Sequence, residues 1–355
     1  MILRRQKKTT QSTAPMRQPK QKKKKTILLF CFLLPIMLII LAGAVYFAKL
    51  YATAQNAVDS SYHTLDRKKE IDVNPLTETT SILIMGIDDN DSRELGSART
   101  DSLIYLTIDP TKHKVNMISI PRDTYTDIVY QDTVYNKDKI NAAYVKGEEQ
   151  ATIESVEHLL NVPIHYYVTF NFDAFLEIID ALGGIEVDVP ITFSEQNAAG
   201  ILDQIHLEKG LQTLNGEQAL ALARTRKIDN DVKRGERQQL LIQAIVDKAL
   251  SVGSISKYSN AITAVGKNMR TDLRFDDMLG IAQTGLDGKY EFESYVFDWT
   301  DFMLGGASMV ELYPDSVDFI SHRLRVALGL DIADERDTSD YEFQTNGLSN
   351  YYGDY

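Results

Sequence analysis

The sequence lacks several residues and motifs that mark disulfide-bonded domains and well-known classes of enzyme. It has one cysteine, Cys31, so no disulfide can form within the chain and no cysteine-ligated metal site can be built. It also lacks the Gly-x-Ser-x-Gly elbow of serine hydrolases and the P-loop of nucleotide-binding enzymes. A domain of this composition outside the cell must be held together by its apolar core alone. Histidines are few and show no zinc-ligand spacing, at His63, His113, His158, His165, His206 and His322.

Positive charge is scarce outside the first 25 residues. Those residues contain ten of the 38 lysines and arginines and no acidic residue, so the remainder carries 28 basic residues against 50 acidic ones, a net charge of −22. A body this acidic argues against the non-specific nucleic-acid binding that a DNA-associated regulator needs. With 44% hydrophobic residues in 355, the chain can build one large domain or two small ones.

One apolar stretch, residues 26–48, contains no charged residue and is long enough to cross a hydrocarbon core of about 30 Å as a helix. Four lysines, residues 22–25, precede it, and only Lys49 follows closely, so the positive-inside bias predicts a cytoplasmic amino terminus and a single-pass type II topology. The alternative is a cleaved signal peptide, because small residues that resemble cleavage sites follow at 42–44 and 52–54. The length of the stretch favours the anchor, since secretory apolar cores usually run only ~7–15 residues.

By composition, the chain divides into five segments, of which the apolar stretch is the second. Residues 1–25 are predicted to be a basic cytoplasmic tail, and residues 49–79 an extracellular stalk or an initial helix. Residues 80–330 form the predicted folded domain, and residues 331–355 are an acidic, polar tail that we expect to be disordered.

Apolar runs of two periodicities alternate through the folded domain. Short runs predict strands at 81–87, 102–108, 115–120, 166–170, 185–189 and 292–297, and helical periodicity predicts helices at 150–160, 172–181, 215–223, 236–249, 275–284 and 316–328. Strands interleaved with helices of this length indicate an α/β fold, a single layered α-β-α domain with a central mixed sheet.

Charged residues cluster at the predicted strand ends, where α/β sheets generally bind ligands. Asp88 follows the first strand, Arg99 and Asp101 immediately precede the second, and Arg122 follows the third. Carboxylates on a short loop suit Mg²⁺, which takes one or two protein carboxylates and completes its shell with water and substrate phosphates. Two aspartates that flank a loop are, taken alone, more often turn and cap residues.

A second cluster places four arginines, Arg224, Arg226, Arg234 and Arg237, around Asp229 and Asp231. Arginine suits an anion-binding site because its planar fork donates paired hydrogen bonds to phosphate oxygens and stays charged. The alternative is a solvated helix start with surface ion pairs. The first cluster, at the strand ends, favours the anion-binding interpretation.

Six spaced motifs follow one another through the predicted domain. The motifs are Gly86-Ile87-Asp88; Arg99-Thr100-Asp101-Ser102; Ser119-Ile120-Pro121-Arg122-Asp123; Lys139-Ile140-Asn141-Ala142-Ala143-Tyr144; Asp180-Ala181-Leu182-Gly183-Gly184; and Leu214-Asn215-Gly216-Glu217-Gln218-Ala219-Leu220, which leads into Arg224-Thr225-Arg226, Asp231 and Arg234-Gly235-Glu236-Arg237-Gln238. In their order and spacing, these motifs resemble the LytR-CpsA-Psr family of Gram-positive cell envelopes. Two small departures leave the charged positions intact: Glu148 stands where a second glycine is common, and Leu222-Ala223 where an aromatic residue often precedes the arginine.

The resemblance implies an extracellular, membrane-anchored phosphotransferase. Such an enzyme moves an anionic glycopolymer, such as wall teichoic acid or capsular polysaccharide, from undecaprenyl diphosphate to peptidoglycan through a phosphodiester. By position, the resemblance makes Asp88 and Asp101 ligands of Mg²⁺ or Mn²⁺. It assigns the diphosphate and the rim of the site to Arg99, Arg122, Arg224, Arg226, Asp231, Arg234, Arg237 and Gln238. One of the aspartates would serve as general base, and the sequence does not choose which.

A lipid-linked substrate also requires an apolar slot within the domain. Candidates to line it are Phe170, Phe172, Phe175, Leu176, Ile179, Leu240, Leu241, Ile245 and Val246, although helices of any α/β domain use such stripes for the core. Three other functions fit parts of the pattern: a non-catalytic polyprenyl-phosphate sensor, a transcriptional attenuator, and a Mg²⁺-dependent lipid pyrophosphatase with water as acceptor. Topology and charge argue against the attenuator, which would need a basic cytoplasmic domain.

Overall fold

The computed structural model describes residues 41, 43–46, 48–49, 51–66, 73–87, 99–225, 231–249, 268–338 and 340–341. The chain forms two compact units, Met1–Tyr51 and Ala52–Tyr355. In the first unit the described residues are helical, and they include only the end of the predicted membrane span, whose remainder lies outside the described residues. None of the helices within the described ranges combines the length and apolar character needed to cross a membrane.

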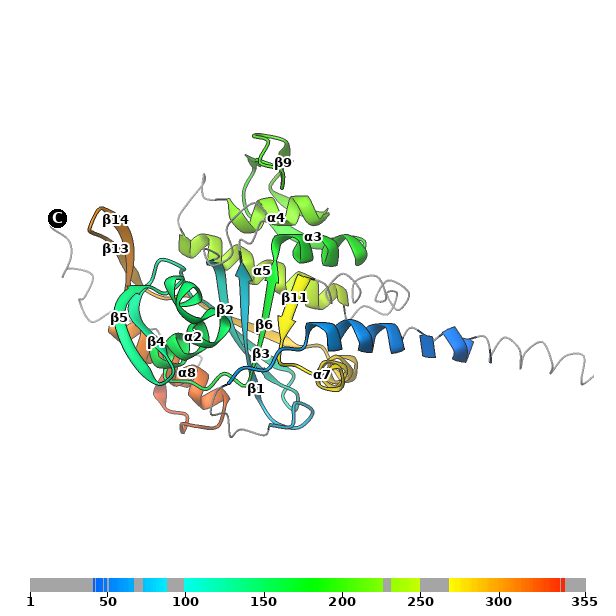
Figure 1. Cartoon of the computed structure of the whole chain (residues 1–355), viewed down its shortest axis with the longest axis horizontal. Coiled ribbons are helices and arrows are strands. Elements are labelled where there is room, and N and C mark those ends of the chain that lie inside the picture. The colour runs from blue at the N-terminus through cyan, green and yellow to red at the C-terminus, as the bar shows by residue number, and fades with distance from the viewer. Residues whose placement is uncertain are drawn as a thin grey trace, which may run out of the picture. The chain divides into compact units, whose positions relative to one another are not determined.

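A six-stranded mixed sheet forms the centre of the second unit, in the order β11-β6-β1-β2-β3-β12 (Figure 1). Its strands are β1 (Thr80–Ile87), β2 (Thr100–Asp109), β3 (Lys114–Ser119), β6 (Tyr166–Asn171), β11 (Met269–Thr271) and β12 (Glu291–Tyr295). β1 runs parallel to β6 and antiparallel to β2, and β3 runs antiparallel to β2 and parallel to β12. The predicted α/β fold with a central mixed sheet is therefore confirmed.

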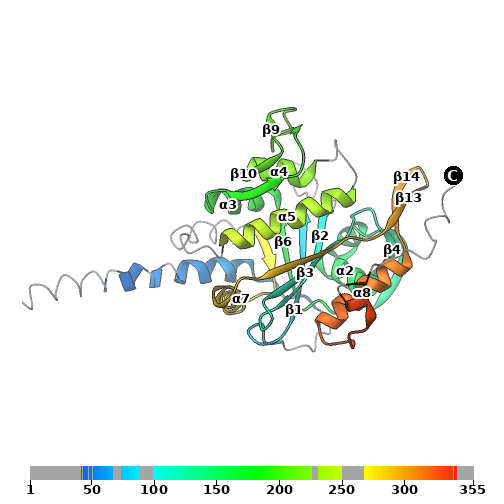
Figure 2. The ribbon, with the colours of Figure 1, turned by 180° about the vertical axis from the view of Figure 1, so that it is seen from behind.

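The two faces of the sheet are covered by different helices because side chains alternate along each strand. Leu83 and Met85 of β1 pack in one core with α2 (Ala142–Leu160) and α8 (Pro314–Ala327). Ile82 and Ile84 face the opposite side, where they pack with α5 (Asp231–Ala249) and α7 (Phe275–Asp287). Figure 2 shows α5 crossing this second face. The arrangement is three layers, helix on sheet on helix.

A smaller layer stands beyond the carboxyl ends of β1 and β6, and it has a core of its own (Figures 1 and 2). It contains α3 (Phe172–Ala181), β7 (Ile185–Val189), β8 (Phe193–Glu195), β9 (Ile205–Leu207), β10 (Gly210–Leu214) and α4 (Gly216–Arg224). α3 and α4 can pack closely because residue 216 is glycine: a Cβ atom there would lie only 2.6 Å from the carbonyl oxygen of Leu176. Asp180 Oδ1 accepts a hydrogen bond from the Gly216 amide at 2.8 Å. Two of the six motifs thus build this layer.

Several elements were not predicted from the sequence. Two hairpins, β4 (Tyr125–Tyr130) with β5 (Thr133–Lys139) and β13 (Trp299–Leu304) with β14 (Ala307–Leu312), lie side by side through a bridge between Thr124 and Val310. β8, β9, β10 and β11 are further short strands that we did not predict. α2 begins at Ala142 rather than at residue 150, with a kink at Gly147 and Glu148, where Glu148 has a φ of 51°.

Both flanks of the predicted catalytic domain contain structured residues. Residues 52–61, within the segment predicted as a stalk or initial helix, are helical, and Ala54 and Val58 are buried. At the other end, Glu335–Asp337 form a short 3-10 helix that packs near α8, within the tail that we expected to be disordered. Residues 342–355 lie outside the described residues.

We call the contacts that hold this short helix the C-terminal ion-pair network. Its members are His322, Arg323 and Arg325 of α8, Glu293 of β12, and Asp331, Asp334, Arg336 and Asp337. Within the described residues, His322, Asp334 and Asp337 are the one group with metal-ligand spacing, a cluster that tertiary contacts create and sequence spacing did not reveal. Each of its aspartates also pairs with an arginine, so their charges are balanced within the network.

Candidate active site

The site begins where β2 enters the sheet. Because β2 is antiparallel to β1, its first residues lie at the carboxyl end of β1, with Ser102 paired to Gly86. This register brings Asp101 to the edge of the sheet that the sequence predicted for ligand binding. The Asp101 carboxylate forms an ion pair with Nη1 of Arg122, which follows β3, and about a quarter of each side chain is exposed.

Arg122 is held from its other side by the motif that contains Lys139. Its Nε lies 3.7 Å from the Asp123 carboxylate, which in turn pairs with Lys139 Nζ at 2.7 Å. The backbone amide of Asn141 donates to the Arg122 carbonyl at 3.2 Å. The motif around Arg122 and the motif around Lys139, which the β4–β5 hairpin separates in the chain, therefore contact each other. Their contacts hold the Arg122 guanidinium beside Asp101.

Helix α5 contributes two side chains one turn apart on a single face. Arg234 Nη2 donates to the Asp101 carbonyl at 3.2 Å, and Gln238 Oε1 accepts from Ser102 Oγ at 2.8 Å. The helix can come this near the sheet because residue 235 is glycine: a Cβ there would lie 2.5 Å from Ser119 Oγ. The Arg-Gly-x-x-Gln spacing is thus explained by packing as well as by chemistry.

Helix α4 contributes Arg224 from the smaller layer. Its Nη2 donates to the carbonyl oxygens of Gln196 and, at 2.6 Å, Asn197. Its Nε is buried and has no hydrogen-bond partner among the described residues. Burial lowers the pKa of Arg224, and Glu195 and Glu217 act in the opposite direction, so the guanidinium stays charged at neutral pH.

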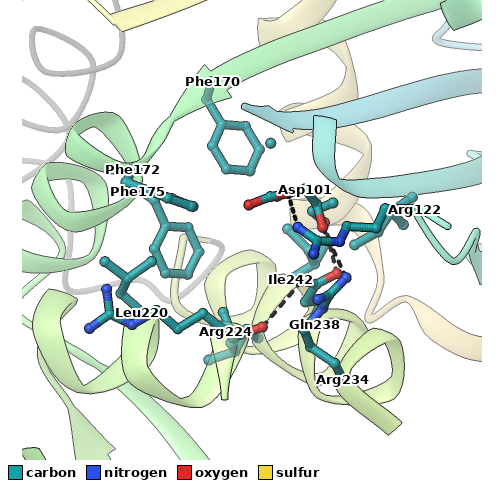
Figure 3. Close-up of a pocket in the computed structure, with 15 residues that line it drawn as sticks. Asp101, Arg122, Phe170, Phe172, Phe175, Leu220, Arg224, Arg234, Gln238 and Ile242 are labelled. Atoms are coloured by element: carbon teal, nitrogen blue, oxygen red, sulfur yellow. Dashed lines mark hydrogen bonds and ion pairs between the residues drawn. The ribbon is translucent and has the colours of Figure 1, made fainter. Parts of the chain in front are cut away.

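Asp101, Arg122, Arg234 and Gln238 lie at one end of a cavity of about 240 Å³ between the sheet, α5 and the smaller layer, and the Arg224 side chain extends toward the side of Leu220 and Phe175 (Figure 3). The other end is apolar, and Figure 3 shows Phe170, Phe172 and Phe175 lining it opposite Arg122 and Arg234. The lining residues are Gly86, Asp101, Ser102, Ile104, Arg122, Phe170, Phe172, Phe175, Leu220, Ala223, Arg224, Arg234, Gln238, Leu241 and Ile242. Of these described lining residues, three are cationic and one is anionic, so the polar end favours an anion.

The structure brings together five of the residues predicted for the catalytic and substrate-binding site: Asp101, Arg122, Arg224, Arg234 and Gln238. Arg99 is exposed and does not line the cavity. Asp88 and Arg226 lie outside the described residues, as does the side chain of Asp231, the first residue of α5. For these residues the assignment stays a prediction.

Arg237 does not line this cavity, although we predicted it to bind substrate. It is 4% exposed, and its guanidinium donates to backbone carbonyls at the end of α4. The residues predicted to line the lipid slot likewise fall into two groups, those that line the cavity and those that do not. Phe170, Phe172, Phe175 and Leu241 line the cavity, whereas Leu176, Ile179, Leu240 and Ile245 belong to the core of the smaller layer and do not line the cavity.

Sequence reasoning missed five apolar or small lining residues, Gly86, Ile104, Leu220, Ala223 and Ile242, and the polar Ser102. Ser102 belongs to the Arg-Thr-Asp-Ser motif, and its position beside Asp101 was the available signal. The apolar residues carried no such signal, because their strand and helices also bury similar residues in the cores.

Known proteins with a similar chain support one family. A model of the LytR_cpsA_psr family matches residues 46–325. The polyisoprenyl-teichoic acid–peptidoglycan teichoic acid transferase TagV of Bacillus subtilis is 36% identical over 300 residues, 82% of this chain and 75% of TagV. The corresponding transferase TagU of Enterococcus faecalis is 38% identical over 279 residues, 77% of this chain and 88% of TagU.

A solved structure of TagT bound to LIIa-WTA has a similar fold. It superposes with a TM-score of 0.62 at 31% identity and covers 75% of this chain and 96% of that one. The likeness spans 96% of that chain, so it covers nearly the whole solved domain rather than one layer of it.

Proposed function

Because this chain belongs to the LytR_cpsA_psr family, we propose that it is a phosphotransferase that moves an anionic glycopolymer from undecaprenyl diphosphate to peptidoglycan. The observation that carries the proposal is the cavity, whose lining combines apolar and aromatic side chains with three arginines. A lipid diphosphate has a matching combination, since an apolar chain is joined to a polyanion. The transferase names of TagV and TagU give the same reaction class.

In the proposed reaction, an acceptor hydroxyl of peptidoglycan attacks the phosphorus atom that bears the glycopolymer. A new P–O bond forms, the P–O bond to the lipid-side phosphate breaks, and undecaprenyl phosphate departs with the electron pair. The hydroxyl proton passes to a base. Negative charge grows on the departing phosphate, and Arg122, Arg224 and Arg234 would stabilise it from fixed positions.

The preorganisation of these arginines comes from their contacts. Arg122 is held between Asp101 and Asp123, and Arg234 donates to the Asp101 backbone. Arg224 has a buried Nε without a hydrogen-bond partner among the described residues, which a phosphate oxygen would satisfy. Donors that need no rearrangement cost little reorganisation at the moment of reaction.

Asp101 fits the role of one magnesium ligand. Its carboxylate lies at the polar end of the cavity and is partly exposed, and Mg²⁺ often takes only one or two protein carboxylates beside substrate phosphates. Asp88, the second predicted ligand, lies outside the described residues. When bound, the ion would neutralise part of the diphosphate charge.

We further propose that the catalytic domain lies outside the cell and that residues 26–48 anchor it as a single-pass helix. The basic residues before this stretch support that orientation. An anchor of this kind would keep the domain close to a carrier lipid in the same membrane, which raises the effective concentration of the donor. Wall teichoic acid is the favoured polymer because TagV and TagU are named for it.

The test is a transfer assay with the full chain in detergent. The chain is incubated with a lipid diphosphate-linked glycopolymer, Mg²⁺ and peptidoglycan fragments, and mass spectrometry follows the phosphodiester-linked product. We expect product that depends on acceptor and on Mg²⁺. Hydrolysis of the donor at the same rate with and without acceptor would instead indicate a pyrophosphatase, and binding without turnover would indicate a sensor.

A further inference from the structure

Arg237 lies in α5 directly before Gln238, yet it points to a different part of the molecule. Its Nε donates to the carbonyl oxygen of Leu222 at 3.2 Å, and its Nη2 donates to that of Thr225 at 2.7 Å. The side chain is buried, and the described cavity lining does not include it. The guanidinium group of an arginine in α5 thus binds the backbone at the end of α4.

The carbonyls that it contacts are those that a helix leaves without partners. The last carbonyl groups of any α-helix lack an intrahelical donor. α4 ends at Arg224, and its cap residue Thr225 is already extended, with φ −59° and ψ 134°. Side chains of α5 supply the missing donors, because Gln238 Nε2 also donates to the Ala223 carbonyl at 3.2 Å. A cation at the carboxyl end of a helix is favourable for the helix dipole as well.

These contacts surround Arg224. The carbonyl groups of Leu222, Ala223 and Thr225 are all held by α5, so the backbone that carries Arg224 is fixed on both sides. We propose that Arg237 is a positioning residue: it fixes the end of α4 and thereby aims the Arg224 guanidinium into the cavity. This inference rests on the proposed function, in which Arg224 binds the substrate diphosphate.

Arginine is suited to this task in a way that lysine is not. Its planar fork presents Nε and Nη donors in a fixed geometry, so one side chain can bond two carbonyls that lie on either side of Arg224. Lysine keeps the charge but concentrates its donors at one point, so it can hold only one of the two carbonyls well. Arg237→Lys therefore separates charge from positioning.

The test compares two ligands on the full chain, geranylgeranyl diphosphate and geranylgeranyl monophosphate. We expect the wild type to bind the diphosphate more tightly, and we expect Arg237→Lys to lose about tenfold of that preference, since small displacements of a positioned group can cost this much. A variant that is merely less stable would lose affinity for both ligands in the same ratio. Arg237→Gln, which retains an amide donor but no charge, should show the same loss.

Lys233→Ala is the matched control, because Lys233 lies on an exposed side of α5, where it pairs with Glu236 one turn away. It should keep the wild-type ratio. Amide hydrogen exchange provides an independent readout: exchange at residues 222–225 should be faster in Arg237→Lys than in the wild type or Lys233→Ala.

The outcomes separate the two proposals. If Arg237→Lys keeps both the wild-type ligand ratio and the wild-type exchange at 222–225, the positioning role is refuted. If the wild type itself does not distinguish the two ligands, the proposed function fails. The exchange measurement then decides the role of Arg237 alone, where faster exchange supports it and unchanged exchange overturns it.

Discussion

Two groups of three arginines in this molecule differ in the acidic groups that face them. The cavity arginines, Arg122, Arg224 and Arg234, share a described lining with one carboxylate, that of Asp101; Asp123, 3.7 Å from Arg122 Nε, is not part of that lining. The arginines of the C-terminal ion-pair network each have a carboxylate of their own at 2.6 to 3.6 Å. The same residue type therefore lines a cavity in one place and makes structural ion pairs in the other.

This difference teaches that charge balance in the folded structure, and not the density of arginine in the sequence, indicates function. The sequence alone does not distinguish the two groups of arginines, because both have aspartates close by in the chain. The fold decides which carboxylates reach which guanidinium.

The largest contrast is expected from removing a cavity arginine. Arg122→Ala should lower the transfer rate by about 10²–10³-fold, the usual effect of losing one preorganised donor to developing charge. Its free energy of unfolding should change by about 1 kcal/mol or less, because the pair with Asp101 is partly exposed. The transfer assay and urea unfolding measure the two effects. A folded Arg122→Ala protein with full activity would contradict the assignment.

The C-terminal ion-pair network should show the opposite pattern. Arg323→Met removes the partner of Glu293 at 2.6 Å and of Asp337 at 3.6 Å, and the Arg323 and Asp337 side chains are each 14% exposed, against 25% and 28% for Arg122 and Asp101. We expect the free energy of unfolding to fall by about 1–3 kcal/mol, since carboxylates are left without a partner. Activity per folded molecule should stay at the wild-type level. A large loss of activity without loss of stability would contradict the distinction between the cavity arginines and the arginines of the C-terminal ion-pair network.

Inorganic pyrophosphate provides a milder comparison, because it offers the phosphates without the lipid. At ten times its dissociation constant it should stabilise the wild type by about 1.4 kcal/mol, which raises Tm by about 2–4 °C in a thermal unfolding scan. Arg323→Met should retain this increase, whereas Arg122→Ala and Arg224→Ala should lose most of it. An equal increase in all four proteins would show that pyrophosphate binds elsewhere.

The smallest effect is expected in acid. Hydrogen bonds from the Arg336 side chain and backbone lower the pKa of Asp334 from 3.8 to about 2. A lowered carboxyl pKa contributes stability that is present above the unfolded pKa and is lost as the pH falls toward 2. Arg336→Gln should therefore show a smaller drop in the urea midpoint between pH 5 and pH 3 than the wild type. An equal drop in the two proteins would contradict this contribution of the Arg336–Asp334 contact.

Much of the central fold could be predicted because its strands are apolar on both faces. β1 and β3 are almost continuous buried runs, and they end in the charged residues of the site. β5 could not be found in this way, because Thr133–Lys139 is polar and largely exposed and shows no alternation. Its position depends on pairing with β4, a tertiary contact without a local signal.

The candidate site was likewise predictable in part. Asp101 and Arg122 follow from strand ends, and the Arg234 and Gln238 pair follows from one face of a helix. The role of Arg237 does not, because periodicity places it on a different side of α5 without revealing that α4 ends there. Likewise, the pattern of α3 marks Phe175 and Ile179 as buried, but only the packed structure shows that Phe175 meets the cavity and Ile179 the core.

The most direct test of the account is an experimental structure of the full chain with a prenyl diphosphate and Mg²⁺. The account predicts phosphate oxygens within hydrogen-bond distance of Arg122, Arg224 and Arg234, and the prenyl chain between Phe175 and Leu241. Phosphates bound away from these guanidinium groups, or a prenyl chain outside the apolar end of the cavity, would contradict it.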